Sequence, residues 1–253
     1  MSEARERILA EIRRSLGPGR VAPDREAELR AAISARRDNP IPARATALDE
    51  TGRIELFVSM AKEVEATVTR VSSPEAVPEA VARYLAAENL PAELVMAPDP
   101  RLDAIPWHSW PLLRIRRGRA EAQDRVSVTP CQFAIAETGT LMLVSGPQTP
   151  TTLNFLPETH IVVVRGDQIV ATYEEAWHGL RAVRGKGMLP RTINFITGPS
   201  RTADIEQHIE LGAHGPRRLH IVLVEDGQTA GSEEHQQPSK PAGGPSTVAG
   251  GRS

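Results

Sequence analysis

The sequence predicts an α/β fold, namely an open, mostly parallel sheet with helices on both faces, preceded by an N-terminal helical arm. Six short runs are apolar almost throughout and rich in Val, Ile and Leu, at 94–97, 112–115, 140–144, 160–164, 193–196 and 220–224. Strands without polar alternation are typical of sheets that are covered on both faces and therefore largely parallel. Helical patterns separate several of these runs, as an open α/β sandwich requires.

The first 45 residues have the pattern of a helical arm. Ile8, Ile12 and Leu16 recur every four residues among arginines and glutamates, which predicts an amphipathic helix over 5–16. A second helix is predicted over 24–37, with a weaker apolar stripe, before a proline-rich breaker. The arm either packs on its own domain or forms a surface for a partner subunit.

Helical signals continue through the predicted domain, 46–227. Ile54 and Phe57 begin an apolar stripe, and Ser73 with Pro74 has the form of an N-cap followed by a first helical residue. Thr172 and Glu175 form a capping box, and a last helix is predicted over 202–209. Residues 228–253 contain almost no aliphatic side chains, so we expect a disordered tail.

Composition excludes several classes of protein. The net charge of −2 disfavours a nucleic-acid-binding surface. We expect no membrane span, because no run approaches about 18 apolar residues, and the chain begins with charged residues rather than a signal sequence, which predicts a cytoplasmic protein. Cys131 is the single cysteine, so the chain forms no internal disulfide and cannot by itself supply the roughly four thiolates of an iron–sulfur cluster. It precedes an apolar run, which favours a buried, inert thiol.

The first candidate site is the turn that contains Glu137, Thr138, Gly139 and Thr140 between two apolar runs. Gly139 permits a positive φ, so the turn can present the Glu137 carboxylate from a sharp bend. The alternative is that Glu137 only accepts backbone N–H bonds at a hairpin.

The second candidate follows the 193–196 run and includes Gly198, Ser200, Arg201 and Thr202. If a helix begins here, its free N–H groups lie at the carboxyl end of a strand and favour an anion such as a small carboxylate or phosphate. The alternative is that Ser200 or Thr202 simply caps the helix. The segment is not a phosphate-binding Walker loop, and the chain contains no GxGxxG.

The third candidate is the loop 211–217, where His214 can titrate near neutrality and Arg217 can bind a carboxylate. The glycines and proline of this loop are equally consistent with a simple turn. The remaining histidines show neither HxxxH nor HExxH spacing, so we expect no metal site.

Four segments together resemble the LUD-domain family, and within it the group of lactate utilization protein C. They read AIAETGTLML, LPETHIVVV, ITGPSRTADIE and LGAHGPRRLHIVLV, and the resemblance extends in order over about residues 50–225. It implies a fold similar to the NagB/RpiA/CoA-transferase group and a role in oxidising L-lactate to pyruvate beside two cysteine-rich, iron–sulfur-type partner proteins. This chain would then be the cluster-free component, with no cofactor of its own.

The wider CoA-transferase group suggests a second hypothesis. A Glu-x-Gly turn there can carry a catalytic carboxylate, and Glu137 with Gly139 matches that turn in outline. The chain is thus either a subunit of a lactate-oxidising complex, in which Arg201, His214 and Arg217 bind a small carboxylate or organise partners, or a CoA-transferase-like enzyme or small-anion binder that uses Glu137.

Overall fold

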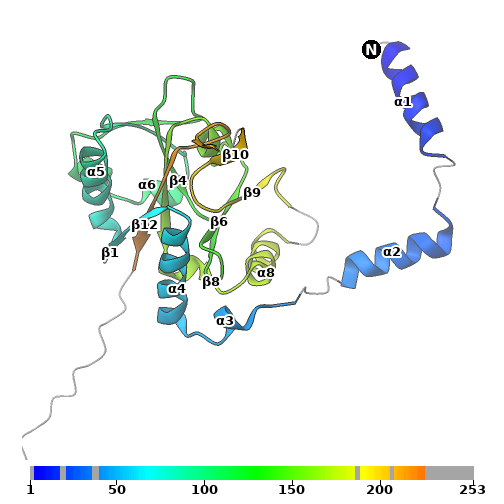
Figure 1. The fold of residues 1–253 in the computed structure, drawn as a ribbon, viewed down its shortest axis with the longest axis horizontal. Coiled ribbons are helices and arrows are strands. Elements are labelled where there is room, and N and C mark those ends of the chain that lie inside the picture. Colours follow the sequence, from blue (N-terminus) through cyan, green and yellow to red (C-terminus); the bar gives the residue numbers. More distant parts are fainter. Residues whose placement is uncertain (1–2, 18–20, 36–39, 186–188, 206–207, 226–253) are drawn as a thin grey trace, which may run out of the picture.

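The computed structural model describes residues 3–17, 21–35, 40–185, 189–205 and 208–225. The body of the molecule is a parallel sheet with helices on both faces and a smaller second sheet, while α1 (Glu3–Ser15) and α2 (Pro23–Ala35) extend away from it (Figure 1). The predicted tail, 228–253, lies outside the described residues. None of the described helices is both long and apolar enough to cross a membrane.

The main sheet has six strands in the order β1-β12-β7-β4-β2-β3, and every neighbouring pair is parallel. Its central strands are buried over nearly their whole length, which confirms the prediction of an open parallel sheet. The strands are β1 (Thr67–Val71), β2 (Glu93–Met96), β3 (Arg114–Arg117), β4 (Val126–Pro130), β7 (Thr159–Arg165) and β12 (Arg218–Val224).

Two of the predicted strands belong to a second sheet. This sheet has the order β8-β5-β6-β9, in which β6 is antiparallel to both of its neighbours. Its strands are β5 (Phe133–Ile135), β6 (Thr140–Val144), β8 (Ile169–Val170) and β9 (Ile193–Ile196). The apolar runs 140–144 and 193–196 are therefore strands, as expected, but not strands of the parallel sheet.

Helices cover both faces of the main sheet because consecutive side chains of its strands point to opposite faces. Val222 of β12 packs in one apolar cluster with Val81 of α5, and Leu223 packs in another with Phe57 of α4. The second sheet packs on the α4 side. The helices are α3 (Ala43–Thr46), α4 (Glu50–Glu63), α5 (Val77–Ala87), α6 (Pro100–Asp103), α7 (Thr152–Phe155) and α8 (Tyr173–Arg184), with short 3₁₀ turns at Pro74–Ala76, Trp107–Ser109 and Gly166–Gln168.

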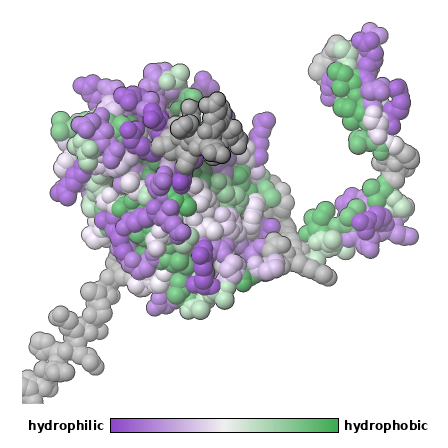
Figure 2. Space-filling model, viewed as in Figure 1, coloured by the Kyte–Doolittle hydropathy of each residue, from purple (hydrophilic) through white to green (hydrophobic). Residues whose placement is uncertain are grey.

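The arm consists of α1 (Glu3–Ser15) and α2 (Pro23–Ala35), close to the two predicted helices. Of the residues that the structure describes in these helices, none is buried. Figure 2 shows apolar residues gathered along one side of α1. Beyond α2, the short helix α3 rejoins the body, where Ala45 is fully buried.

The predicted last helix, 202–209, is wrong. The chain instead forms an antiparallel hairpin of β10 (Arg201–Ile205) and β11 (His208–Leu211). The capping residues and acids of this segment resemble a helix start, but Thr202, Ile205 and Ile209 are β-branched and favour strands. Residues 201–205 form a strand because they pair with residues 208–211, and the local sequence pattern does not reveal that pairing.

Candidate functional site

The turn between β5 and β6 is shaped by Gly139. Its φ is +64°, and a Cβ at this position would collide with the backbone of Met60 and Ala61 in α4. Glycine therefore serves two purposes here, the left-handed conformation and the close approach of the turn to a helix. The turn is consequently held against α4 and is not a free surface loop.

Glu137 is buried, with 6% of its surface exposed. The backbone N–H of Tyr173, the first residue of α8, donates to Oε1 of Glu137 over 3.2 Å. The guanidinium of Arg44 donates to the backbone carbonyl of Glu137. A carboxylate at a helix N-terminus satisfies a free N–H and the helix dipole. These contacts match the expected alternative, in which Glu137 accepts backbone bonds, and they add no support for a nucleophile.

The threonines of the turn form a hydroxyl network. Oγ1 of the buried Thr140 lies 2.7 Å from Oγ1 of Thr138, 3.0 Å from the Tyr173 hydroxyl and 2.7 Å from Oγ1 of Thr197. The network joins the turn to α8 and to the end of β9. Sequence reasoning missed Tyr173, although its place directly after the capping residue Thr172 puts it at a helix start.

Arg201 does not stand at a helix N-terminus, because residues 201–205 form a strand. Its guanidinium donates to the backbone carbonyl of Val64 over 2.7 Å and lies 3.3 Å from Oε1 of Glu65. Arg201 thus binds the carbonyl end of α4, where a cation is favourable. The helix-terminus argument for an anion at Ser200, Arg201 and Thr202 is therefore wrong, and the Thr202 side chain lies outside the described side chains.

The structure does bring the second and third candidate segments together. The N–H of Ser200 donates to the carbonyl of Pro216, and the N–H of Gly212 donates to the carbonyl of Ser200. Beside these bonds lies a pocket of about 220 Å³ that includes Gly198, Ser200 and His214 from the predicted site. Arg201 and Arg217 are not among its lining residues. The Arg217 side chain instead crosses the face of Gly212, where a Cβ would meet it.

His160 forms part of this pocket and is fully buried. Its Nε2 lies 2.7 Å from Oγ1 of Thr129, while its Nδ1 has no hydrogen-bond partner among the described residues. Burial lowers the pKa of His160 to about 3, so the ring is neutral near pH 7. The pocket lies near the amino ends of β7 and β12, at the opposite edge of the sheet from the one that usually binds ligands.

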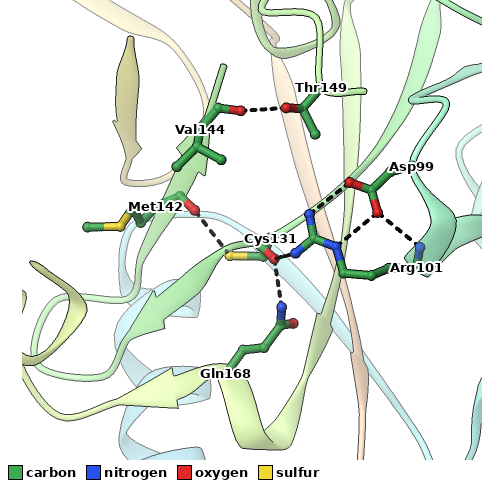
Figure 3. A network of polar contacts seen from close by, with 7 residues as sticks. All are labelled: Asp99, Arg101, Cys131, Met142, Val144, Thr149 and Gln168. Carbon is green, nitrogen blue, oxygen red and sulfur yellow. Dashed lines mark hydrogen bonds and ion pairs between the residues drawn. The ribbon is translucent and has the colours of Figure 1, made fainter. Parts of the chain in front are cut away.

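The carboxyl edge of the main sheet carries an ion pair that the sequence analysis did not single out (Figure 3). Asp99 follows β2, and its two carboxylate oxygens each lie 2.9 Å from the Arg101 guanidinium. Nη1 of Arg101 donates to the carbonyl of Cys131 over 2.8 Å, and Nε2 of Gln168 donates to the same carbonyl over 2.7 Å. The sequence Pro98-Asp99-Pro100-Arg101, directly after an apolar run, is the signal that could have identified it.

Two charges in this ion pair stabilise each other. Burial opposes ionisation of Asp99, but hydrogen bonds and the positive charge of Arg101 outweigh it and lower the pKa of the Asp99 carboxyl. Asp99 also accepts the backbone N–H of Arg101 as the N-cap of α6. The guanidinium is therefore held in one orientation.

The Cys131 thiol is fully buried beside this ion pair, and burial raises its pKa to about 12. Its sulfur lies 2.8 Å from the carbonyl oxygen of Phe133. A thiol with this pKa is protonated near pH 7 and is a poor nucleophile and metal ligand. The prediction of a buried thiol is confirmed, and its inertness stays a prediction. Within the described ranges, no three His, Cys, Asp or Glu residues gather as metal ligands, and the metal-free chain stays a prediction.

Comparison with known proteins places this arrangement in a family. Residues 54–224, from α4 to β12, match the sequence profile described as the LUD domain. This chain belongs to the LUD-domain family. The match confirms the resemblance inferred from the four segments, and it begins after the arm and α3.

The chain is similar to curated proteins named lactate utilization protein C. It is 38% identical to that of Geobacillus sp. strain WCH70 over 105 residues, which cover 41% of this chain and 44% of the relative. It is 36% identical to those of Shouchella clausii, over 43% of this chain and 47% of the relative, and of Bacillus subtilis, over 41% and 44%. The matched part spans about half the length of these relatives, or slightly less.

A crystal structure of a DUF162 family protein from Deinococcus radiodurans is similar to this chain as well. The two superpose with a TM-score of 0.52 and 28% sequence identity, over 70% of this chain and 99% of the other. Nearly the whole of that protein therefore has its counterpart here.

Proposed function

We propose that this chain acts in lactate utilization in the cytoplasm, as the cluster-free component of an iron–sulfur-dependent complex that oxidises L-lactate to pyruvate. The observation that carries the proposal is the similarity of the chain to LUD-domain relatives named lactate utilization protein C. Two cysteine-rich iron–sulfur proteins are the proposed partners. They would carry the electrons that leave lactate when its hydroxyl carbon is oxidised.

The chemistry of the chain's thiol supports the assignment of a cluster-free role. The full sequence has one cysteine, whereas an iron–sulfur cluster takes about four thiolates. That cysteine is also buried, with a pKa raised to about 12. Any cluster of the complex is therefore assigned to the partner chains.

Lactate-dependent growth tests the proposal. We expect that deleting the gene in its source organism abolishes growth on L-lactate, leaves growth on glucose unchanged, and is reversed by the wild-type chain. Cys131→Ala should restore growth equally well, because the thiol has no part in the chemistry. Normal growth of the deletion strain on L-lactate would refute the role in lactate utilization.

Affinity purification from lactate-grown cells tests the complex separately. We expect two cysteine-rich proteins to co-purify with iron, and the chain produced alone to contain no stoichiometric iron. Iron that remains bound to the isolated wild-type chain, but not to Cys131→Ala, would contradict the cluster-free assignment.

A further inference from the structure

A second pocket, of about 150 Å³, lies at the carboxyl edge of the main sheet, where β4, β7 and β12 end. This is the edge at which open α/β sheets bind ligands. Its lining consists of apolar side chains, among them Leu102, Ala104 and Val163, and of four charged or polar groups, Glu75, Arg101, Arg165 and Gln168.

Arg101 offers this pocket unused hydrogen-bond donors. A guanidinium has five N–H donors, and three of those of Arg101 bind Asp99 Oδ1, Asp99 Oδ2 and the Cys131 carbonyl. The other two donors have no partner among the residues that the structure describes, and the side chain is 38% exposed, so an incoming ligand can reach it.

The orientation of this guanidinium is set before any ligand arrives. Asp99 is 4% exposed, binds Arg101 through both oxygens and caps α6, so the pair is fixed to the end of β2. By contrast, pairs such as Arg30 with Glu26 join long side chains on exposed helices. A fixed guanidinium loses less entropy when it binds a planar carboxylate than a free one does.

The remaining lining sets the size and character of the ligand. Arg165 and Glu75 also line the pocket and carry opposite charges, and Arg165 lies 3.2 Å from Asp167, so it is the remaining donors of Arg101 and not the net charge of the lining that favour a carboxylate. The walls are apolar, with Leu102 and Val163 buried beneath the rim. The volume is well below the roughly 300 Å³ at which pockets for drug-sized ligands begin, so it suits a molecule of a few heavy atoms.

We propose that this pocket binds a small monocarboxylate, with its carboxylate on the free donors of Arg101 and its short apolar end against Leu102 and Val163. The class of ligand follows from the pocket itself. The narrower identification of this acid as lactate or pyruvate rests on the proposed function.

Binding by the purified full-length chain tests the site. L-Lactate, pyruvate, propionate and inorganic phosphate are titrated separately into isotope-labelled protein, and NMR shifts of the pocket residues are followed. We expect the three monocarboxylates to bind at millimolar concentration or better and to shift Leu102 and Val163, and phosphate to bind more weakly. Arg101→Lys keeps the charge but loses the planar fork, so binding should weaken about tenfold or more.

Two further variants separate binding from folding. Ala104→Phe leaves the ion pair in place but adds bulk at an exposed lining position, and it should abolish carboxylate binding. Arg117→Lys is the matched control, because Arg117 is similarly exposed, pairs with Asp103 and lies outside the pocket lining. It should bind as the wild type does.

The proposal is overturned if no monocarboxylate shifts the pocket residues, if phosphate binds more tightly at the same residues, or if Ala104→Phe binds as well as Arg117→Lys. These results are independent of the growth test. A chain that binds no acid yet restores growth on lactate refutes the pocket and leaves the proposed function. A chain that binds acids but is not needed for growth on lactate refutes the proposed function and leaves the pocket.

Discussion

Helices α1 and α5 have the same spacing of aliphatic residues, but these residues are buried in α5 and exposed in α1. Aliphatic residues recur every four positions in both, as Ile8 and Ile12 in α1 and as Val81 and Leu85 in α5. Leu85 is 2% exposed against the parallel sheet, while Ile12 is 48% exposed. The spacing therefore predicts a helix and its apolar side, but not the surface that covers it, because covering depends on chain segments far away in sequence.

The largest expected effect of a single substitution comes from truncating the apolar stripe of α5. Leu85→Ala leaves a cavity between α5 and the sheet and should lower the free energy of unfolding by about 2 to 5 kcal/mol. Ile12→Ala should change it by less than about 0.5 kcal/mol, because the side chain is already in water. Urea unfolding of both variants measures the difference. An equal loss in Ile12→Ala would show that α1 packs on the body.

A second expected effect is a loss of stability in mild acid. His220 of β12 stacks on Tyr84 of α5 at 3.7 Å between ring centroids, and burial lowers the pKa of His220 to about 4. The pKa of His160 is lowered in the same way, to about 3. Unfolding lets both rings take up a proton below their ordinary pKa of 6.5, while the folded protein keeps them neutral.

The two histidines thus leave the free energy of unfolding at its full value above pH 6.5, and they lower it as the pH falls from 6.5 towards 4. With two such histidines, the slope approaches about 2.7 kcal/mol per pH unit. Urea unfolding between pH 7 and 4.5 measures it, and His220→Gln should roughly halve the slope. The exposed His108→Gln is the control and should keep the wild-type slope. Equal slopes in wild type and His220→Gln would contradict the argument.

The smallest effect is expected from removing the arm. Deletion of residues 1–39 should leave the melting temperature of the body nearly unchanged, because α1 and α2 bury no described residue. Deletion of 1–47 also removes Ala45 and the bond from Arg44 to Glu137, and should cost about 1 to 2 kcal/mol more. Thermal unfolding of the two truncated chains locates the boundary of the body. A large loss on the shorter deletion would mean that α1 or α2 docks.

Strand β4 lies inside the main sheet, yet the sequence analysis did not predict it. Its sequence, Val-Ser-Val-Thr-Pro, alternates apolar and polar residues, yet all five are buried. The Ser127 hydroxyl donates to the carbonyl of Leu153, and Oγ1 of Thr129 lies 2.7 Å from His160 Nε2. Polar side chains can be buried when they find such partners, and the partners come from other elements.

The candidate site was predicted in part for a related reason. The turn at Glu137 and the loops at Ser200 and His214 were found from glycines and polar residues at strand ends. Their contacts were not, since the 201–211 segment pairs with itself as a hairpin and Arg201 binds the end of α4. The fixed pair of Asp99 and Arg101 was missed because its importance lies in contacts with Cys131 and the sheet edge.

The sequence by itself determined the local and additive features: which segments are apolar strands, where Thr172 starts a helix, that one cysteine cannot hold a cluster, and which family the motifs resemble. Only the tertiary structure decided which apolar stripe is covered, which polar atoms are buried, and which charges meet at an edge of the sheet. The physical reason is that strand pairing and desolvation act between residues distant in sequence, whereas periodicity and capping act within a few residues.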